Sequence, residues 1–223
     1  MRFGHHHRRA RETYHHGNLR EALIGAAREL IAERGPAGFS FAEVARAAGV
    51  SPAAPYRHFR DRNALVAEIA RRGFELFAAD LGYAWNNCQP NPWRALESCG
   101  RAYLAFARRE PAYYAAMFET GFALEEDPAL AAAGERAFAI FLTAAEALSA
   151  GMPGAGRPPA RMIALHIWTL SLGIASLFVR PGGGLWRKLP MSPEDLLEAG
   201  VLMYLRALSL GRDNRPGTAE GGA

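Results

Sequence analysis

The side chains with the clearest binding chemistry lie within residues 51–62, where a guanidinium, an imidazole and a phenol occur close together. Arg57 can hydrogen-bond a guanine edge or a phosphate oxygen, and His58 can assist at the phosphates. Three neighbours have no hydrogen-bonding side chain and can offer only apolar contact, for instance to thymine methyl groups: Pro52, Ala53 and Ala54. Such groups suit a polyanion, and if that polyanion is double-stranded DNA, part of the specificity must come from DNA shape because polar base-reading groups are few.

Two short helices joined by a tight turn are expected to present these side chains. Ser40 is a good N-cap for a helix from Phe41 to Ala48, whose apolar residues recur at helical spacing. Gly49 can form the left-handed turn that follows without a steric penalty. The second helix is expected from Ser51 to Phe59, with Pro52 in its first turn. This order predicts a helix-turn-helix.

Pro55 interrupts the expected second helix. It stands at the fourth helical position, where it removes the first regular backbone hydrogen bond. It also biases Ala54 away from helical geometry. A helix that starts near Pro55 is therefore the alternative to one that starts at Ser51, and it would change which residues can face the bases.

The stretch VSPAAPYRHFRDRNAL, residues 50–65, resembles the DNA-binding end of the TetR family of transcriptional repressors, and Tyr14 to Gly35 resembles that family's first helix. The resemblance implies an all-α fold, with an N-terminal three-helix helix-turn-helix DNA-binding domain and a larger C-terminal helical regulatory and dimerisation domain. It also implies that Ser40, Tyr56 and Arg62 contact phosphates. The function expected from it is sequence-specific DNA-binding transcriptional regulation, most simply repression.

The complete set of residues that we predict to contact DNA is Ser40, Ser51, Pro52, Ala53, Ala54, Pro55, Tyr56, Arg57, His58 and Arg62. For Tyr56, and also for Phe59, packing inside a helical bundle is the alternative role. Charge supports a polyanionic partner at this end of the chain. Residues 1–62 hold 11 Arg against 6 acidic residues, whereas residues 63–223 hold 15 basic and 16 acidic ones.

Nothing in the sequence predicts catalysis, a cofactor or a metal site. The two cysteines, Cys88 and Cys99, are too few for a disulfide scaffold or a zinc site, so we expect reduced thiols. The histidines near the N-terminus have no carboxylate or cysteine to complete a metal site. The glycines at 182–184 are not followed by Lys and Ser or Thr, as a phosphate-binding loop requires.

The chain is expected to divide into four parts. These are a mobile basic arm at 1–13, a helix-turn-helix domain at 14–77, a ligand-binding and dimerisation domain at 78–210, and a disordered tail at 211–223. A long helix that begins near Asp61 is expected to join the two domains. Further helices are predicted at 93–110, 112–118, 125–150, 162–179 and 192–209.

The helix at 162–179 carries no formal charge over 18 residues, which is about the length of a membrane span. Polar residues interrupt it and arginines flank both ends, so a buried or subunit-interface helix is the better interpretation. The N-terminus has no apolar run of the secretory type. We therefore expect a cytoplasmic protein.

An effector pocket is expected between helices within Trp93–Trp168, and it favours a small hydrophobic molecule, aromatic or weakly acidic, that relieves repression. Its predicted lining is Trp93, Arg101, Tyr103, Phe106, Tyr114, Met117, Phe118, Phe141, His166 and Trp168. Core packing is the alternative role for most of these. The helix at 162–179 also resembles a TetR subfamily with a recurring Trp, His and Gly, but Leu172 stands where that His is expected.

A homodimer is expected, since one helix-turn-helix buries too little surface for tight binding and two-fold proteins match palindromic operators. The helices at 162–179 and 192–209 are the predicted interface. In the latter, an apolar stripe recurs at Leu196, Leu197, Val201 and Leu205. The alternative function is an all-helical small-molecule binding or enzyme domain whose N-terminal helices are only structural.

Overall fold

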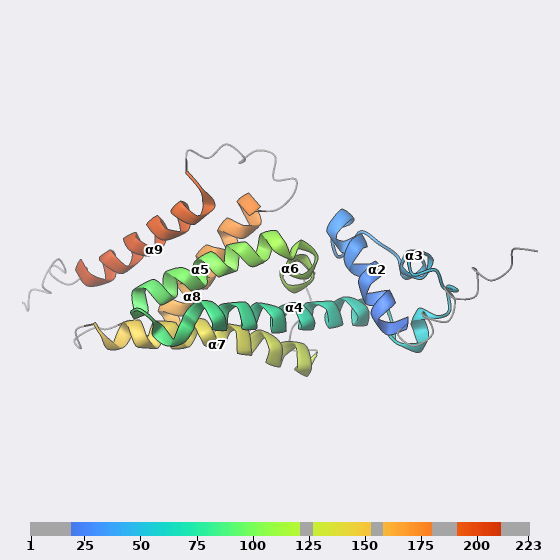
Figure 1. Cartoon of the computed structure of the whole chain (residues 1–223), viewed down its shortest axis with the longest axis horizontal. Coiled ribbons are helices and arrows are strands. Elements are labelled where there is room, and N and C mark those ends of the chain that lie inside the picture. The colour runs from blue at the N-terminus through green and yellow to red at the C-terminus, as the bar shows by residue number, and fades with distance from the viewer. Residues whose placement is uncertain (1–18, 121–126, 153–157, 180–190, 211–223) are drawn as a thin grey trace, which may run out of the picture. The chain divides into compact units, whose positions relative to one another are not determined.

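The computed structural model describes residues 19–120, 127–152, 158–179 and 191–210, and every regular element among them is helical (Figure 1). This confirms the all-α fold. The predicted arm at 1–13 and tail at 211–223 lie outside the described residues. The elements, in chain order, are α2 (Leu19–Arg34), α3 (Phe41–Ala47), η1 (Pro55–Arg57), α4 (Arg62–Trp85), η2 (Asn86–Cys88), α5 (Pro92–Arg109), α6 (Pro111–Phe118), α7 (Pro128–Ala150), α8 (Ala160–Ile174), η4 (Ala175–Val179) and α9 (Pro193–Leu210).

The chain forms two compact units, and each unit combines two segments that are separated in the sequence. Unit 1 is Met1–Leu76 with Glu110–Glu135, and unit 2 is Phe77–Arg109 with Arg136–Ala223. Helices α4 and α7 therefore contribute residues to both units, and α6 belongs to unit 1. The predicted boundary between the DNA-binding and ligand-binding domains, at residues 77 and 78, stays a prediction, because a compact unit need not have the same boundary as a functional domain.

Unit 1 is built on the apolar stripe of α2, where Leu23, Ala27 and Ile31 are buried. Helix α2 ends at Arg34, and the next residue, Gly35, has a φ of +79°, the left-handed conformation expected of a helix stop. At the start of α4, the Asp61 carboxylate accepts a 2.8 Å hydrogen bond from the Ala64 amide, as its predicted capping role requires.

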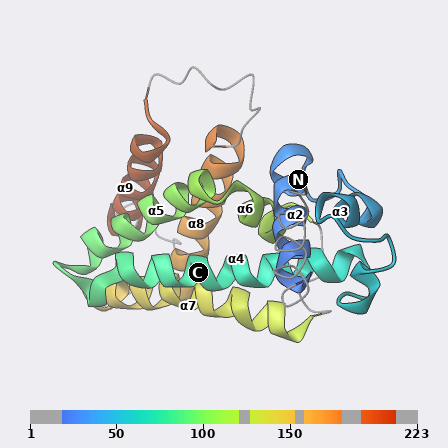
Figure 2. The same cartoon turned by 45° about the vertical axis from the view of Figure 1, so that its right-hand side comes forward.

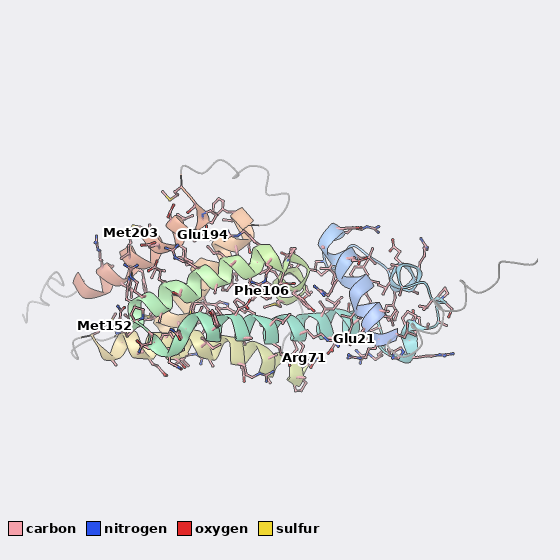
Figure 3. All side chains as sticks on the ribbon, viewed as in Figure 1. Glu21, Arg71, Phe106, Met152, Glu194 and Met203 are labelled. Atoms are coloured by element: carbon pink, nitrogen blue, oxygen red, sulfur yellow. The ribbon has the colours of Figure 1, made fainter. Side chains whose placement is uncertain are left out.

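A network of ion pairs joins α2 to α4 inside unit 1. Arg72 donates to both carboxylate oxygens of Glu21 at 2.5 and 2.6 Å and also to Glu68 at 2.8 Å. Figure 3 shows Glu21 and Arg71 where these two helices approach each other. Because two-pronged pairs fix direction as well as distance, the network sets the register of α2 on α4.

Unit 2 has an aromatic core. Phe77 and Tyr103 pack edge to face with their ring centroids 4.9 Å apart, and Trp168 lies 5.6 Å from Tyr103 and 5.4 Å from Phe141. Phe106 points from α5 towards α4 (Figure 3) and meets Phe77 at 5.0 Å. Helix α8 crosses α5 and lies beside α9 (Figures 1 and 2). These rings pack on one another, as core packing, the alternative role expected for them, requires.

Candidate nucleic-acid interface

The first helix of the helix-turn-helix is held by a complete capping box. The Ser40 hydroxyl accepts from the Glu43 amide at 3.2 Å, and the Glu43 carboxylate accepts from the Ser40 amide at 2.8 Å. Hydrogen bonds from the Ser40 amide and hydroxyl, and then from Arg34, lower the pKa of Glu43 to about 2. The predicted N-cap is therefore present. Ser40 also donates its hydroxyl to Glu43 at 2.8 Å, so a phosphate would compete with this bond.

The second helix differs from the expected Ser51–Phe59 helix, and that prediction is wrong. Residues 51–54 form a turn, closed by the Ala54 amide on the Ser51 carbonyl at 3.0 Å, and only Pro55–Arg57 is helical, as one 3₁₀ turn. The physical reason is Pro55, which has no amide to continue the ladder. Pro52 therefore lies in the turn rather than in a first helical turn, and the alternative start at Pro55 is the one observed.

The turn leaves a short exposed surface. Ser51, Pro52 and Ala53 are exposed, Ala54 is half-buried, and Pro55 is buried beneath them. Because Pro55 is buried, it can shape the surface that its neighbours form, but its own side chain is not accessible to a base. Direct DNA contact by Pro55 therefore has no support in this geometry, although the remaining assignments stay predictions.

Tyr56 combines the two roles weighed for it. Its side chain is 61% exposed, yet its ring packs edge to face on Phe41 at 4.9 Å. Phe59, in contrast, is buried, with the Arg20 guanidinium 5.1 Å from its ring centroid. Phe59 is therefore a packing residue. The Tyr56 ring is fixed by Phe41 while most of its side chain stays accessible to solvent, which suits a residue that contacts a phosphate.

Arg57 and His58 are exposed, as a base or phosphate contact requires. Arg62 is different, since its Nη1 donates to the Pro36 carbonyl at 2.6 Å and its guanidinium carbon lies 5.4 Å from the Phe39 ring centroid. Arg62 thus ties the segment before α3 to the start of α4. Arginine has five N–H groups, and a phosphate contact from Arg62 must use those that do not donate to Pro36 or Asn63.

Two exposed arginines next to this surface were missed from the sequence. Arg46 lies in the last turn of α3, and the Arg60 side chain is 87% exposed, with its Nε 2.9 Å from Asp61. The sequence could have identified both as further DNA-contact candidates, since Arg46 falls on the polar side of the predicted first helix and Arg60 follows the second. Cationic groups there extend the electrostatic footprint beyond Arg57.

The ten predicted effector-pocket residues, which remain a prediction, belong to different parts of the two units. Tyr103, Phe106, Phe141 and Trp168 are in the aromatic core of unit 2. Tyr114, Met117 and Phe118 belong to α6 in unit 1. Trp93 and Arg101 line one hollow described on unit 2, and His166 lines another.

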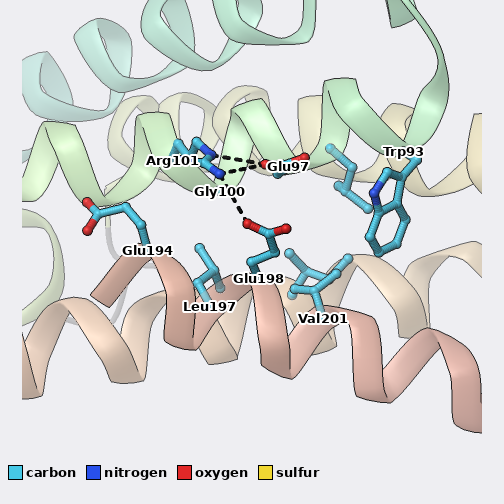
Figure 4. Close-up of a pocket in the computed structure, with 10 residues that line it drawn as sticks. Trp93, Glu97, Gly100, Arg101, Glu194, Leu197, Glu198 and Val201 are labelled. Carbon is cyan, nitrogen blue, oxygen red and sulfur yellow. Dashed lines mark hydrogen bonds and ion pairs between the residues drawn. The ribbon is translucent and has the colours of Figure 1, made fainter. Parts of the chain in front are cut away.

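Trp93 and Arg101 lie on one groove between α5, α8 and α9 (Figure 4). Arg101 Nη2 contacts Glu97 at 2.7 Å and Glu198 at 3.1 Å, so it bridges α5 to α9 across the groove. Leu197 and Val201 make the apolar floor. Since two carboxylates already share the Arg101 cation, this groove is poorly suited to the weakly acidic ligand expected from the sequence.

His166 lines a second hollow, between α8 and α9. Its ring stacks on Tyr204 with centroids 4.2 Å apart, and the hollow has a volume of about 340 Å³. Burial raises the pKa of Tyr204. Across the described part of the chain, no group of three or more His, Cys, Asp or Glu side chains could hold a metal ion.

The fold and the capped α3–turn–η1 surface define a helix-turn-helix DNA-binding protein. Residues 23–69 match the family model for bacterial regulatory proteins of the tetR family, and residues 96–204 match the tetracyclin repressor-like C-terminal domain. The chain belongs to the TetR family and is a DNA-binding transcription regulator.

Solved structures share the fold of this chain. A protein of unknown function from Rhodococcus sp. RHA1 is 31% identical, with a TM-score of 0.71, over 88% of this chain and 98% of that one. The TetR family regulator PfmR from Thermus thermophilus is 17% identical, with a TM-score of 0.61, over 84% and 96%. AibR, solved with isovaleryl coenzyme A and operator DNA, is 21% identical, with a TM-score of 0.63, over 82% and 96%. No curated protein matches the chain.

Proposed function

We propose that this regulator is a cytoplasmic, non-enzymatic repressor that binds a palindromic operator through the surface from Ser40 to Arg62. The observation that carries the proposal is the exposed Tyr56–His58 segment, presented on a capped α3 and a buried Pro55. Tyr56, Arg57 and His58 supply phosphate and base contacts, and Arg46 and Arg60 add positive charge beside them.

A homodimer is supported by apolar side chains that α8, η4 and α9 leave exposed. Leu165 is 44% exposed, Leu177 51% and Met203 67%. The segment Ala160–Phe178 is also long and apolar enough to cross a membrane. About a third of its apolar window is buried within its own chain, so most of this apolar surface is left for a partner to cover. In a DNA-binding regulator, a second copy is the natural cover for such a face, with two helices from each subunit forming a bundle.

The α9 stripe expected to make this interface has another role. Leu197, Val201 and Leu205 are buried within unit 2, and Leu197 packs so close to α5 that a Cβ at Gly100 would lie 2.9 Å from it. The dimer face that we propose therefore uses the outward residues of α8, η4 and α9, and not this stripe.

The effector that we propose is a small apolar molecule bound by unit 2. AibR, a regulator of the same fold, was solved with isovaleryl coenzyme A, which carries a branched acyl group. The aromatic and aliphatic side chains of Trp93, Ile167 and Leu197 supply suitable surface. Helix α4 runs unbroken from unit 1 into unit 2, so a change in its tilt would move the DNA-reading surface. Release requires that the ligand prefer the arrangement that does not bind DNA.

The test is a fluorescence-anisotropy titration of the full chain with DNA from upstream of its own gene. We expect the logarithm of affinity to fall linearly with the logarithm of salt concentration. Arg57→Ala should weaken binding about tenfold at a fixed salt concentration, because it removes a base or phosphate contact. Arg94→Ala, at an exposed arginine of α5 outside the proposed DNA-binding and dimer surfaces, is the control and should leave affinity unchanged. An affinity that changes neither with salt concentration nor in Arg57→Ala would rule out the proposed surface.

A further inference from the structure

Helix α6 is a structural part of the unit that reads DNA. It packs on α2, and it approaches α4 so closely that a Cβ at Gly73 would lie 2.7 Å from Met117 Sδ and 3.2 Å from Tyr113 Cβ. Phe118 of α6 adds an edge-to-face contact with Phe74 of α4, with centroids 5.5 Å apart. The position of α2 in the helix-turn-helix unit therefore depends on where α6 lies.

One arginine of α2 holds this packing. The guanidinium carbon of Arg28 lies 4.1 Å from the ring centroid of Tyr113, within the range of a cation–π contact. Arg28 Nη2 also donates to Glu110 Oε2 at 3.4 Å. Glu110 is the only residue between the end of α5 at Arg109 and the start of α6 at Pro111. Arg28 therefore contacts both the residue that precedes α6 and a ring in the first turn of α6.

Stability alone does not account for an arginine at this position. Arg28 Nε is buried and has no hydrogen-bond partner among the described residues. A buried donor without an acceptor destabilises a fold, whereas a methionine of similar length would pack on Tyr113 without that penalty. A charged group that must contact both Glu110 and Tyr113, however, favours one position of α2 relative to α6.

We propose that Arg28 is a positioning residue that couples the conformation of α6 to the helix-turn-helix. The proposal rests on the function proposed above, since it assumes that unit 1 binds an operator. Coupling of this kind is reciprocal in free energy. Operator binding must therefore shift the conformational equilibrium of α6 by the same free energy as that equilibrium shifts operator affinity. The effector need not be known for a test.

The experiment is hydrogen exchange of the full chain, read by mass spectrometry over residues 111–118. It is run with and without a duplex that the wild-type protein has selected from a random pool. We expect the duplex to slow exchange in α6 by about fivefold in the wild type. In Arg28→Met this response should disappear, while the thermal midpoint of the free protein stays the same or rises.

Arg20 provides a matched control on the same helix. Its side chain is 41% exposed against 38% for Arg28, and it too has one partner carboxylate outside α2, Glu68 at 3.0 Å, and one aromatic ring, Phe59 at 5.1 Å. These contacts are not with α6, so Arg20→Met should keep the α6 response. Tyr113→Phe should keep it as well, because the ring remains, and Tyr113→Leu should lose it.

Two results would overturn the proposal: α6 exchange that ignores the duplex in the wild type, or a response that persists in Arg28→Met and Tyr113→Leu. If Arg28→Met proves too unstable to study, the comparison of Tyr113→Phe with Tyr113→Leu decides the question. A protein that selects no duplex contradicts the proposed function instead, so the two failures are distinguishable.

Discussion

At the scale of single residues, Glu68 shows how one carboxylate organises the DNA-reading unit. Its side chain is only 11% exposed and faces three arginines, Arg20, Arg71 and Arg72, at 2.8–3.0 Å. Burial opposes its charge, but hydrogen bonds from these arginines outweigh burial and lower the pKa of Glu68 to about 2. The charged carboxylate is therefore part of the fold, and its loss should be visible in stability.

Glu68→Gln is expected to lower the free energy of unfolding by about 2 kcal/mol at pH 7, because several charge-assisted hydrogen bonds weaken together. The pKa of Glu68 is lower in the folded state than its ordinary value of 4.5. Its stabilisation is therefore complete above pH 4.5 and declines as the pH falls towards 2. Urea unfolding at several pH values measures this. Glu75→Gln, at a more exposed partner of Arg71, should cost less than about 1 kcal/mol.

Tyr56 offers a prediction that separates its two roles. Tyr56→Phe keeps the ring that packs on Phe41 but removes the hydroxyl. If the hydroxyl contacts a phosphate, operator affinity should fall about threefold to tenfold with the thermal midpoint unchanged. If Tyr56 only packs, Tyr56→Phe should bind like the wild type, and Tyr56→Ala alone should weaken binding. Anisotropy titrations of both variants against one operator distinguish these cases.

At the scale of elements, the helices could be predicted well because their start and stop signals are local. Ser40, Gly49 and Asp61 behave as their types indicate, and Gly49 has the left-handed φ of +70°. The second helix was predicted wrongly because two effects compete there. A favourable capping sequence at Ser51 argues for a long helix, and the missing amide of Pro55 argues against it. The outcome, one 3₁₀ turn, shows that the lost hydrogen bond outweighed the cap.

The close approach of α4 and α6 gives an element-scale prediction. Gly73→Ala should destabilise the protein by about 1–3 kcal/mol, because the new methyl meets Met117 Sδ at 2.7 Å and Tyr113 Cβ at 3.2 Å. Met117→Ala creates space at the first of these contacts. The double variant should therefore lose less stability than the two single losses added together, as a double-mutant cycle in urea would show. Strict additivity would mean that the helices are not in the contact described.

At the scale of the whole molecule, sequence patterns identified faces but not the neighbours that cover them. The period of α9 correctly marked Leu197, Val201 and Leu205 as an apolar stripe, yet the stripe packs within its own unit. Aromatic spacing likewise could not tell a pocket from a core: Tyr103 and Phe141, predicted to line the pocket, are buried and pack against each other. The grouping of α6 with α2 depends on contacts between residues far apart in sequence, such as Arg28 with Glu110, which periodicity cannot reveal.

The last prediction concerns assembly. If the outward faces of α8 and α9 form the dimer, then Leu165→Glu combined with Met203→Glu should place unpaired charges in an apolar interface and produce monomers. Light scattering at micromolar concentration measures the mass. Operator affinity should fall by at least about 100-fold, because each subunit alone reads only half of a palindrome. Tyr83→Glu changes another exposed large side chain, 90% exposed on α4, and should leave the dimer and its operator affinity intact. A dimer that survives the double substitution would place the interface elsewhere.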